Sequence, residues 1–251
     1  MIVLKTRREI DLMREAGRIA ARALKLAGEA VAPGVTTAEI DALARRYIEK
    51  QGAVPSFLNY NGFPAAACIS INHEVIHGIP SRNRVIAEGD LVSIDLGATL
   101  GGFVGDNAAT FMAGKVSEQA EKLCKTTQES LVAGLQAAVA GNRLGDIGHA
   151  VQKHCESRGF SVVRQYTGHG VGKQLHEDPS VPNYGAPGRG VRLLPGMTLA
   201  IEPMVNEGSA GIDHLPDGWT VVTADRKLSA HFEHTIAITK DGECIILTLP
   251  D

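Results

Sequence analysis

The sequence predicts an α+β fold in which two similar halves share an antiparallel sheet, with helices packed on one face. In each half, segments with helical periodicity precede short apolar runs typical of strands, whereas a βαβ protein would alternate them. The second half also echoes the first at an offset of 107 residues, so that Gly34 falls on Gly141. The same offset places Asp95 on Glu202, a carboxylate on a carboxylate. An internal repeat therefore accounts for the order of the elements.

The repeat and the chain length together indicate one domain. The chain has 251 residues, of which 44% are hydrophobic and 21% charged, an ordinary globular composition. A chain of this length can bury a large core without disulfides. We therefore expect a single catalytic domain over residues 1–251, with pseudo-repeat halves at about 6–115 and 116–250.

Helix start signals define the first elements of each half. Thr6 and Glu9 form a capping box ahead of one apolar-periodic segment, and Thr36 and Glu39 form another, which Gly52 ends. In the second half, Ser117 is a candidate cap for a counterpart helix that runs to about residue 140, and a second counterpart helix is expected over about 145–158.

Strands are predicted where short runs are rich in β-branched residues. The Gly101-Gly102 pair is a hairpin turn signal that follows the first of these runs. The predicted strands are Leu91–Gly97, Thr198–Val205, His231–Thr239 and Glu243–Leu247.

Charge and motif content exclude several classes of function. The net charge of −3 provides no basic footprint for nucleic acid, and no apolar run approaches the roughly 18 residues of a membrane span. The first ten residues lack the order of a signal peptide, so we expect a cytoplasmic protein. The four cysteines contain no CxxC pair and are expected to be free thiols. Neither a GxSxG motif nor a P-loop is present.

Four carboxylates lie in apolar strand-like runs: Asp95, Asp106, Glu202 and Glu233. A turn centred on Leu100-Gly101 places Asp95 opposite Asp106, and a turn shifted by one residue makes them diagonal neighbours; either way the Cβ atoms lie within roughly 5–8 Å. Like charges this close need a shared proton or a cation. If the halves pack about a pseudo-twofold axis, all four acids converge, and a pair of bridged divalent ions resolves the repulsion. A buried, hydrogen-bonded acid is the simpler alternative for any one of them.

Three histidines fit such a centre. His169 lies in a glycine-rich segment that favours close backbone approach, His176 follows seven residues later, and His77 precedes Gly78. His231 and His234 flank Glu233 and are weaker candidates to support it, and the remaining four histidines are expected at the surface.

These residues lie in motifs that closely resemble the bacterial type I methionine aminopeptidases, from about Lys5 to Thr248. The motifs are CISINHEVIHGIP at 68–80, SIDLGATLGGFVGD at 93–106, YTGHGVGKQLHEDP at 166–179, AIEPMV at 200–205, DGWTVVT at 217–223 and SAHFEHTIAIT at 229–239. The resemblance implies the pita-bread fold, whose internal pseudo-twofold agrees with the repeat.

The resemblance also implies the metal ligands. Asp106 and Glu233 would bridge two divalent ions, Asp95 would hold one of them, and His169 and Glu202 the other. The family is assayed with Co, Mn, Fe(II) or Zn, and ligand chemistry does not choose among these metals. A monovalent cation near Asn72 and Ser229 is a further expectation from the resemblance.

The expected reaction is removal of the N-terminal methionine from nascent proteins and peptides with a small second residue. A metal-bound hydroxide would attack the first peptide bond, Glu202 would shuttle the proton, His176 would stabilise the oxyanion, and His77 would contact the scissile amide or the second residue. The expected methionine pocket is Phe57, Tyr60, Phe63, Cys68, Leu175 and Trp219. Phe57 and Leu175 differ from the residues of some relatives.

The expected partners are N-terminal methionine peptides, with a transient ribosome contact, no specific nucleic acid and no membrane, and the protein is expected to be a monomer. Two alternatives stay open. A proline-directed aminopeptidase of the same fold would cleave Xaa-Pro, and a non-enzymatic binding protein would have lost metal ligands, whereas all five positions are present here.

Overall fold

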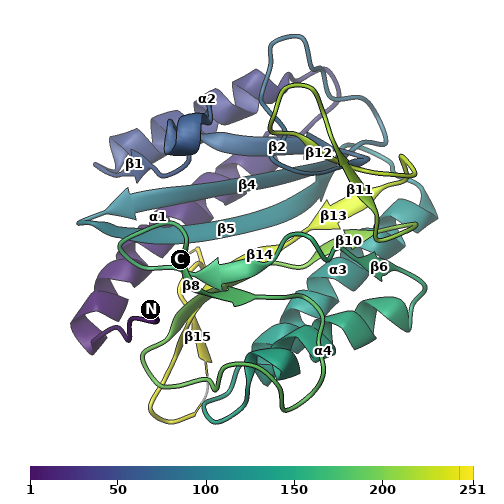
Figure 1. Cartoon of the computed structure of the whole chain (residues 1–251). Coiled ribbons are helices and arrows are strands. Elements are labelled where there is room, and N and C mark those ends of the chain that lie inside the picture. The colour runs from purple at the N-terminus through teal and green to yellow at the C-terminus, as the bar shows by residue number, and fades with distance from the viewer. Residues whose placement is uncertain (243, 251) are drawn as a thin grey trace.

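The structure is a computed structural model that describes residues 1–242 and 244–250 (Figure 1). Its α-helices lie at the start of each half of the chain, as predicted. They are α1 (Arg7–Glu29), α2 (Thr37–Lys50), α3 (Glu118–Ala137) and α4 (Leu144–Glu156), with a short 3-10 turn η1 (Tyr60–Gly62).

The strands of the main sheet all pair antiparallel, which confirms the predicted α+β class. The order of the sheet is β1-β4-β5-β14-β9-β7-β8, with β2 beside β4 and β15 beside β14. Its strands are β1 (Val54–Pro55), β2 (Ala67–Ile71), β4 (Leu91–Leu100), β5 (Phe103–Met112), β7 (Gly168–Gly170), β8 (Glu177–Val181), β9 (Thr198–Ile201), β14 (Glu233–Ile238) and β15 (Cys244–Ile246).

Two smaller sheets flank the main one. One has the order β13-β10-β6 and the other β11-β12-β3. Their strands are β3 (Glu74–Ile76), β6 (Ser161–Val162), β10 (Met204–Asn206), β11 (Ile212–His214), β12 (Val221–Thr223) and β13 (Ser229–His231).

The predicted caps start three of the four helices. The hydroxyls of Thr6 and Thr36 each accept the backbone N–H of a glutamate three residues on, whose carboxylate accepts the cap N–H in return. Ser117 accepts the N–H of Ala120 at the start of α3. The chain turns out of α2 at Gly52, where φ is +74°.

Two predicted strands are broken, which corrects the sequence analysis. The run Thr198–Val205 divides at Glu202-Pro203 into β9 and β10, and the run His231–Thr239 divides at Phe232 into β13 and β14. At both breaks the chain leaves one sheet for another: β9 and β14 pair in the main sheet, whereas β10 and β13 pair with each other. The N–H of Phe232 donates to the carbonyl of Pro203, so the two breaks lie side by side. The predicted strand Glu243–Leu247 corresponds to β15, and its first residue, 243, lies outside the described residues.

The helices pack closely on the sheet. α1 contacts β4 and β5, whereas α3 packs on α4 and contacts β13, β10 and β9 (Figure 1). The approach of α1 to β5 depends on glycine, because a Cβ at Gly105 would lie 2.3 Å from the Cα of Gly17. Within residues 1–242 and 244–250, no helix is long and apolar enough to cross a membrane.

Candidate metal centre

The four carboxylates reach the centre from neighbouring strands of the main sheet. Asp95 lies on β4, Asp106 on β5 and Glu233 on β14, and Glu202 directly follows β9. The hairpin turn lies at Gly101-Gly102, which pairs Asp95 with Ala108 and makes Asp95 and Asp106 diagonal neighbours. Of the two registers left open by the sequence, the shifted one is therefore correct.

The same diagonal arrangement of two acids recurs between β5 and β14. Glu233 pairs with Ala108, so Asp106 is its diagonal neighbour on β5. His169 on β7 pairs with Ala200, two residues before Glu202. Because side chains two residues apart point to one face of a strand, all five groups are directed to the same side of the sheet.

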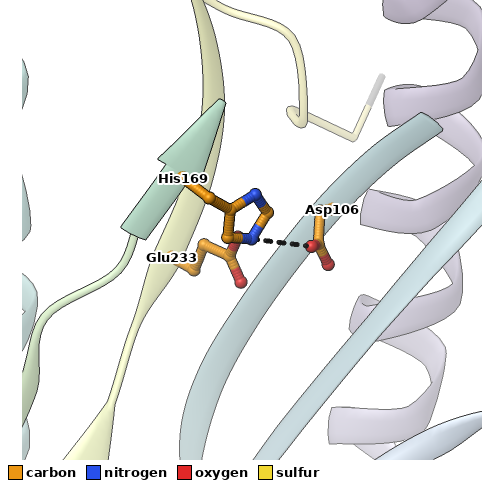
Figure 2. Close-up of side chains that lie close together, drawn as sticks. All are labelled: Asp106, His169 and Glu233. Atoms are coloured by element: carbon orange, nitrogen blue, oxygen red, sulfur yellow. Dashed lines mark ion pairs between the residues drawn. The ribbon is translucent and has the colours of Figure 1, made fainter. Parts of the chain in front are cut away.

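Figure 2 shows three of these side chains converging from β5, β7 and β14. Ligand atoms of Asp106, His169 and Glu233 all lie within 4.8 Å of one another, an arrangement that can hold a metal ion. His169 Nε2 lies 3.7 Å from Asp106 Oδ2 and 3.4 Å from Glu202 Oε1. Glu202 thus extends the cluster.

The second ring nitrogen of His169 determines which atom faces the carboxylates. Its Nδ1 donates to the carbonyl of Gly170 over 2.8 Å. Burial, with a smaller contribution from the neighbouring His176, lowers the pKa of His169 to about 4, so the ring is neutral at pH 7. A neutral ring that donates through Nδ1 leaves the Nε2 lone pair free for a cation.

The carboxylates lack the partners that buried acids normally need. Burial raises the pKa of Asp95 to about 8 and raises those of Asp106, Glu202 and Glu233 well above their usual range; mutual repulsion adds to the shift of the last three. Among residues 1–242 and 244–250, no hydrogen-bond donor reaches the buried oxygens Asp95 Oδ1, Asp106 Oδ1 and Glu233 Oε1. Buried oxygens without donors, facing an unprotonated imidazole, fit divalent cations.

A cavity of about 190 Å³ opens directly onto the cluster. Its lining contains every residue that the sequence analysis singled out for metal, catalysis or the methionine pocket, together with Asn61. These are Phe57, Tyr60, Phe63, Cys68, His77, Asp95, Asp106, His169, Leu175, His176, Glu202, Trp219 and Glu233.

The apolar wall of this cavity is held by its own contacts. Phe63 and Trp219 meet edge to face with ring centroids 5.1 Å apart. Asp217 accepts the backbone N–H groups of Trp219 and Thr220 at 2.8 Å each, which fixes the turn that presents the indole.

The two candidate catalytic histidines lie at the mouth of the cavity. His77 has φ of +60°, unusual for a residue other than glycine, and its ring meets Tyr166 edge to face. His176 is exposed and lies beside His169, with ring centroids 4.3 Å apart. A hydrogen bond of 2.8 Å joins His176 Nδ1 to the hydroxyl of Tyr60. Both rings also face a wider groove of about 1050 Å³.

The two weaker histidine candidates, His231 and His234, have different surroundings in the structure. His231 is buried, and its Nε2 lies 3.8 Å from Glu202 Oε2, so it contacts Glu202 instead of the adjacent Glu233. His234 is hydrogen-bonded through Nδ1 to the hydroxyl of Thr248. Of the histidines expected at the surface, His214 is exposed and His73, His149 and His154 are half-buried.

Asn72 and Ser229, the residues expected near a monovalent cation, are adjacent. The N–H of Ser229 donates to the carbonyl of Asn72. The Asn72 side chain is occupied by Asp90 and by the N–H of Leu91.

The sequence analysis missed Asn61 and the contact between Tyr60 and His176. Asn61 lies in η1 with φ of +50° and follows Asn59 at +65°. Two asparagines around one tyrosine indicate a left-handed turn, and this signal could have located the segment that brings Tyr60 to the cavity.

Comparison with known proteins agrees with this geometry. The model of metallopeptidase family M24 matches residues 11–240. The methionine aminopeptidase of Clostridium acetobutylicum is 54% identical over 246 residues, which cover 98% of each chain. Methionine aminopeptidase 1 of Bacillus subtilis is 54% identical over 242 residues, or 96% of this chain and 97% of the relative.

The solved structures that resemble this chain include another methionine aminopeptidase and a related peptidase. The methionine aminopeptidase of Thermotoga maritima superposes with a TM-score of 0.97 at 46% identity, covering 99% of this chain and all of its own. The prolidase of Pyrococcus furiosus has a TM-score of 0.79 at 24% identity, covering 99% of this chain and 66% of its own, and shows a shared fold alone. These neighbours confirm the expected pita-bread fold. The protein is a member of metallopeptidase family M24 and, like that family, uses divalent metal ions.

Proposed function

We propose that this protein removes the N-terminal methionine from peptides and nascent proteins whose second residue is small. The observation that carries the proposal is the cavity of about 190 Å³ that runs from an apolar wall to four carboxylates and a neutral histidine. The methionine aminopeptidases at 54% identity support it, because they match this chain over nearly its whole length.

The proposed metal ligands are the five groups of the cluster. Asp106 and Glu233 would bridge two ions, Asp95 would hold one, and His169 and Glu202 the other. The donor set suits Co, Mn, Fe(II) or Zn. When bound, such ions supply Lewis acidity and lower the pKa of water toward neutrality.

The ligand set explains why the activity would be restricted to chain ends. The free α-amino group of the substrate, in its unprotonated form, would bind at the ion that Asp95 holds. An internal residue has no such amine and would place an amide there. The arrangement therefore favours an exopeptidase.

The wall of the cavity suits an unbranched thioether. Phe57, Phe63, Leu175 and Trp219 provide apolar and aromatic surface, and sulfur makes favourable contacts at ring edges. Cys68 pairs with Asp95 across β2 and β4, so the pocket and the proposed ligands share one piece of sheet. Methionine would therefore be held with its first carbonyl next to the carboxylates.

The proton transfers would be divided among three side chains. Glu202 lies at the cavity and would take up and release the proton. His176 would donate to the developing oxyanion from the cavity mouth, and His77 would contact the scissile amide or the second residue. Burial lowers the pKa of His77 to about 4, so it would act as a neutral ring.

The remaining parts of the proposal concern the surroundings of the enzyme. We expect one domain over residues 1–251 with repeat halves at about 6–115 and 116–250, a monomer, a cytoplasmic location and transient contact with the ribosome. We also expect a monovalent cation beside Asn72 and Ser229.

Peptide hydrolysis tests the proposed function. Metal-stripped protein would be supplied anaerobically with Mn, Fe(II), Co or Zn and offered Met-Ala-Ser or Ala-Pro-Ala. The proposal requires metal-dependent release of methionine, its loss in Glu202→Gln, and its retention in Glu49→Gln, which changes an exposed helix glutamate paired with Arg45. Release of alanine ahead of proline would instead identify a proline-directed aminopeptidase, and no hydrolysis by folded, metal-loaded protein would leave the binding-protein alternative.

A further inference from the structure

We propose that the ion pair between Lys5 and Glu177 is a positioning device for His176, and that it holds the exposed imidazole at the mouth of the cavity. This inference rests on the proposed function, in which His176 acts on the substrate. It concerns two residues that do not line the cavity of about 190 Å³ themselves.

The pair is buried, which separates it from the surface ion pairs of this protein. The side chains of Lys5 and Glu177 are 5% and 15% exposed, whereas those of the exposed pair Lys25–Glu29 are 51% and 60% exposed. Lys5 Nζ donates to Glu177 Oε2 and to the carbonyl of Val3. Most of the water that normally screens such a pair is therefore excluded.

Glu177 is the residue after His176, and its second oxygen holds the loop that precedes both. Glu177 Oε1 accepts the N–H of Gln174 at 3.1 Å. The carbonyl of Gln174 in turn accepts the N–H of Gly172 at 3.1 Å. Residues 172–177 are thus closed into a compact turn, which Glu177 joins to the buried Lys5.

Packing around Gly172 shows how tightly the pair fits against this turn. A Cβ at Gly172 would lie 2.5 Å from Lys5 Cε and 2.6 Å from Glu177 Oε1. The absence of a side chain at Gly172 therefore makes room for the pair.

The pair connects the turn to the start of α1. The N–H of Lys5 donates to the carbonyl of Gly196 at 2.7 Å, and Thr6 is the N-cap of α1. The N-terminal segment runs beside β8, which begins at Glu177, and the Met1 ammonium pairs with Asp178 (Figure 1). The backbone of His176 is therefore fixed through Glu177 to a long helix.

The ring of His176 is held by a contact that does not involve the Lys5–Glu177 pair. Its ring nitrogen Nδ1 is hydrogen-bonded to Tyr60, which belongs to η1 and not to the turn. An exposed imidazole that is held at its ring by Tyr60 and His169 keeps its orientation only if its backbone is also fixed. The Lys5–Glu177 pair supplies this second constraint.

A double-mutant cycle separates positioning from simple stabilisation. Lys5→Met is expected to lower kcat for Met-Ala-Ser by about 10- to 100-fold with KM within about 2-fold, because small misplacements of reacting groups cost up to this much. In a His176→Ala background the same change should have no further effect, since the pair acts through His176. Multiplicative losses in the double variant would overturn the proposal.

Two companion variants keep the test decisive. Glu177→Gln preserves the shape of the side chain and covers the case in which Lys5→Met fails to fold, and Lys5→Arg should restore most of kcat. Lys25→Met, in the exposed pair on α1, is the matched control and should retain wild-type kcat.

A second measurement does not depend on activity. In zinc-loaded protein labelled with 15N-histidine, the ring signals of His176 are those lost in His176→Ala. They should shift or broaden in Lys5→Met and Glu177→Gln and stay unchanged in Lys25→Met. Wild-type protein that released no methionine would refute the proposed function. The spectra would still test whether the Lys5–Glu177 pair positions His176. Unchanged His176 signals in folded variants would refute it.

Discussion

Removing the metal should make the stability of this protein fall as pH rises above neutrality. In the metal-free protein, burial raises the pKa of Asp95 from 3.8 to about 8. A carboxyl group whose folded-state pKa is raised contributes stability that is complete below its unfolded pKa and is lost as pH rises toward the folded value. Asp106, Glu202 and Glu233 shift in the same direction and add to the loss.

Buried histidines set the lower limit of a clean pH window. Burial lowers the pKa values of His77, His169 and His234 to about 4 and that of His231 to about 3. These groups oppose the effect around pH 6.5, the ordinary pKa of histidine, because the unfolded chain still holds part of its histidine protons there. Most of those protons are gone at pH 7, so the four carboxylates dominate the slope from pH 7 to 8.

The magnitude follows from Asp95 alone. One proton retained in the folded state costs about 1.4 kcal/mol per pH unit, and part of that proton is lost as pH approaches 8, so the rise from pH 7 to 8 removes about 1 kcal/mol. For a chain of this size that lowers Tm by about 2–4 °C, and the other three acids increase the change.

Thermal unfolding followed by circular dichroism measures this effect. Metal-free protein should lose at least those few degrees between pH 7 and 8, and Asp95→Asn should reduce the slope. Protein saturated with Mn or Zn should have a higher Tm and no such loss, because its carboxylates are ionised as ligands throughout. A metal-free Tm that is constant or rises over this interval would refute the reasoning.

Three further predictions follow from single contacts. Tyr60→Phe removes the hydrogen bond to His176 and should lower kcat by roughly 10-fold with little change in Tm, as steady-state kinetics and thermal unfolding would show. Gly105→Ala places a methyl group 2.3 Å from the Cα of Gly17, so urea unfolding should report a loss of about 3 kcal/mol; a loss below about 0.5 kcal/mol would mean that α1 moves away freely. Thr36→Ala removes the cap of α2 and should cost about 1 kcal/mol in the same assay with catalysis unchanged, whereas an unchanged midpoint would show that the cap contributes nothing.

Much of the fold could be predicted because local signals and the global structure agree. The capping boxes at Thr6 and Thr36 start helices where expected. The glycine pair at 101–102 forms the turn between β4 and β5, but two registers remained open because both bring Asp95 and Asp106 within range. Only the packed sheet selects between them.

The strand breaks at Glu202 and Phe232 could not be predicted from periodicity. Apolar residues dominate both runs on either side of their charged and histidine positions, and each run breaks because the chain changes sheets, which is a tertiary event. Pro203, which has no N–H to donate, was the one local indication.

The cavity was predicted more completely than the contacts that hold it. Every candidate site residue lines it, and all of them except Phe57, Tyr60 and Phe63 lie in the specific motifs of the sequence. The links from Tyr60 and Lys5 to the segment of His176 join residues more than 100 positions apart, and no spacing rule connects them.

The most direct test of the account is the number of divalent ions that the chain binds. Metal-stripped protein would be dialysed against Mn or Zn and its bound metal measured by atomic emission, in wild type and in Asp106→Asn. Two ions per wild-type chain are expected, with a clear loss in the variant, because Asp106 forms a group with His169 and Glu233 that can hold a metal ion. Folded wild-type protein that binds no divalent ion at saturating concentration would contradict it.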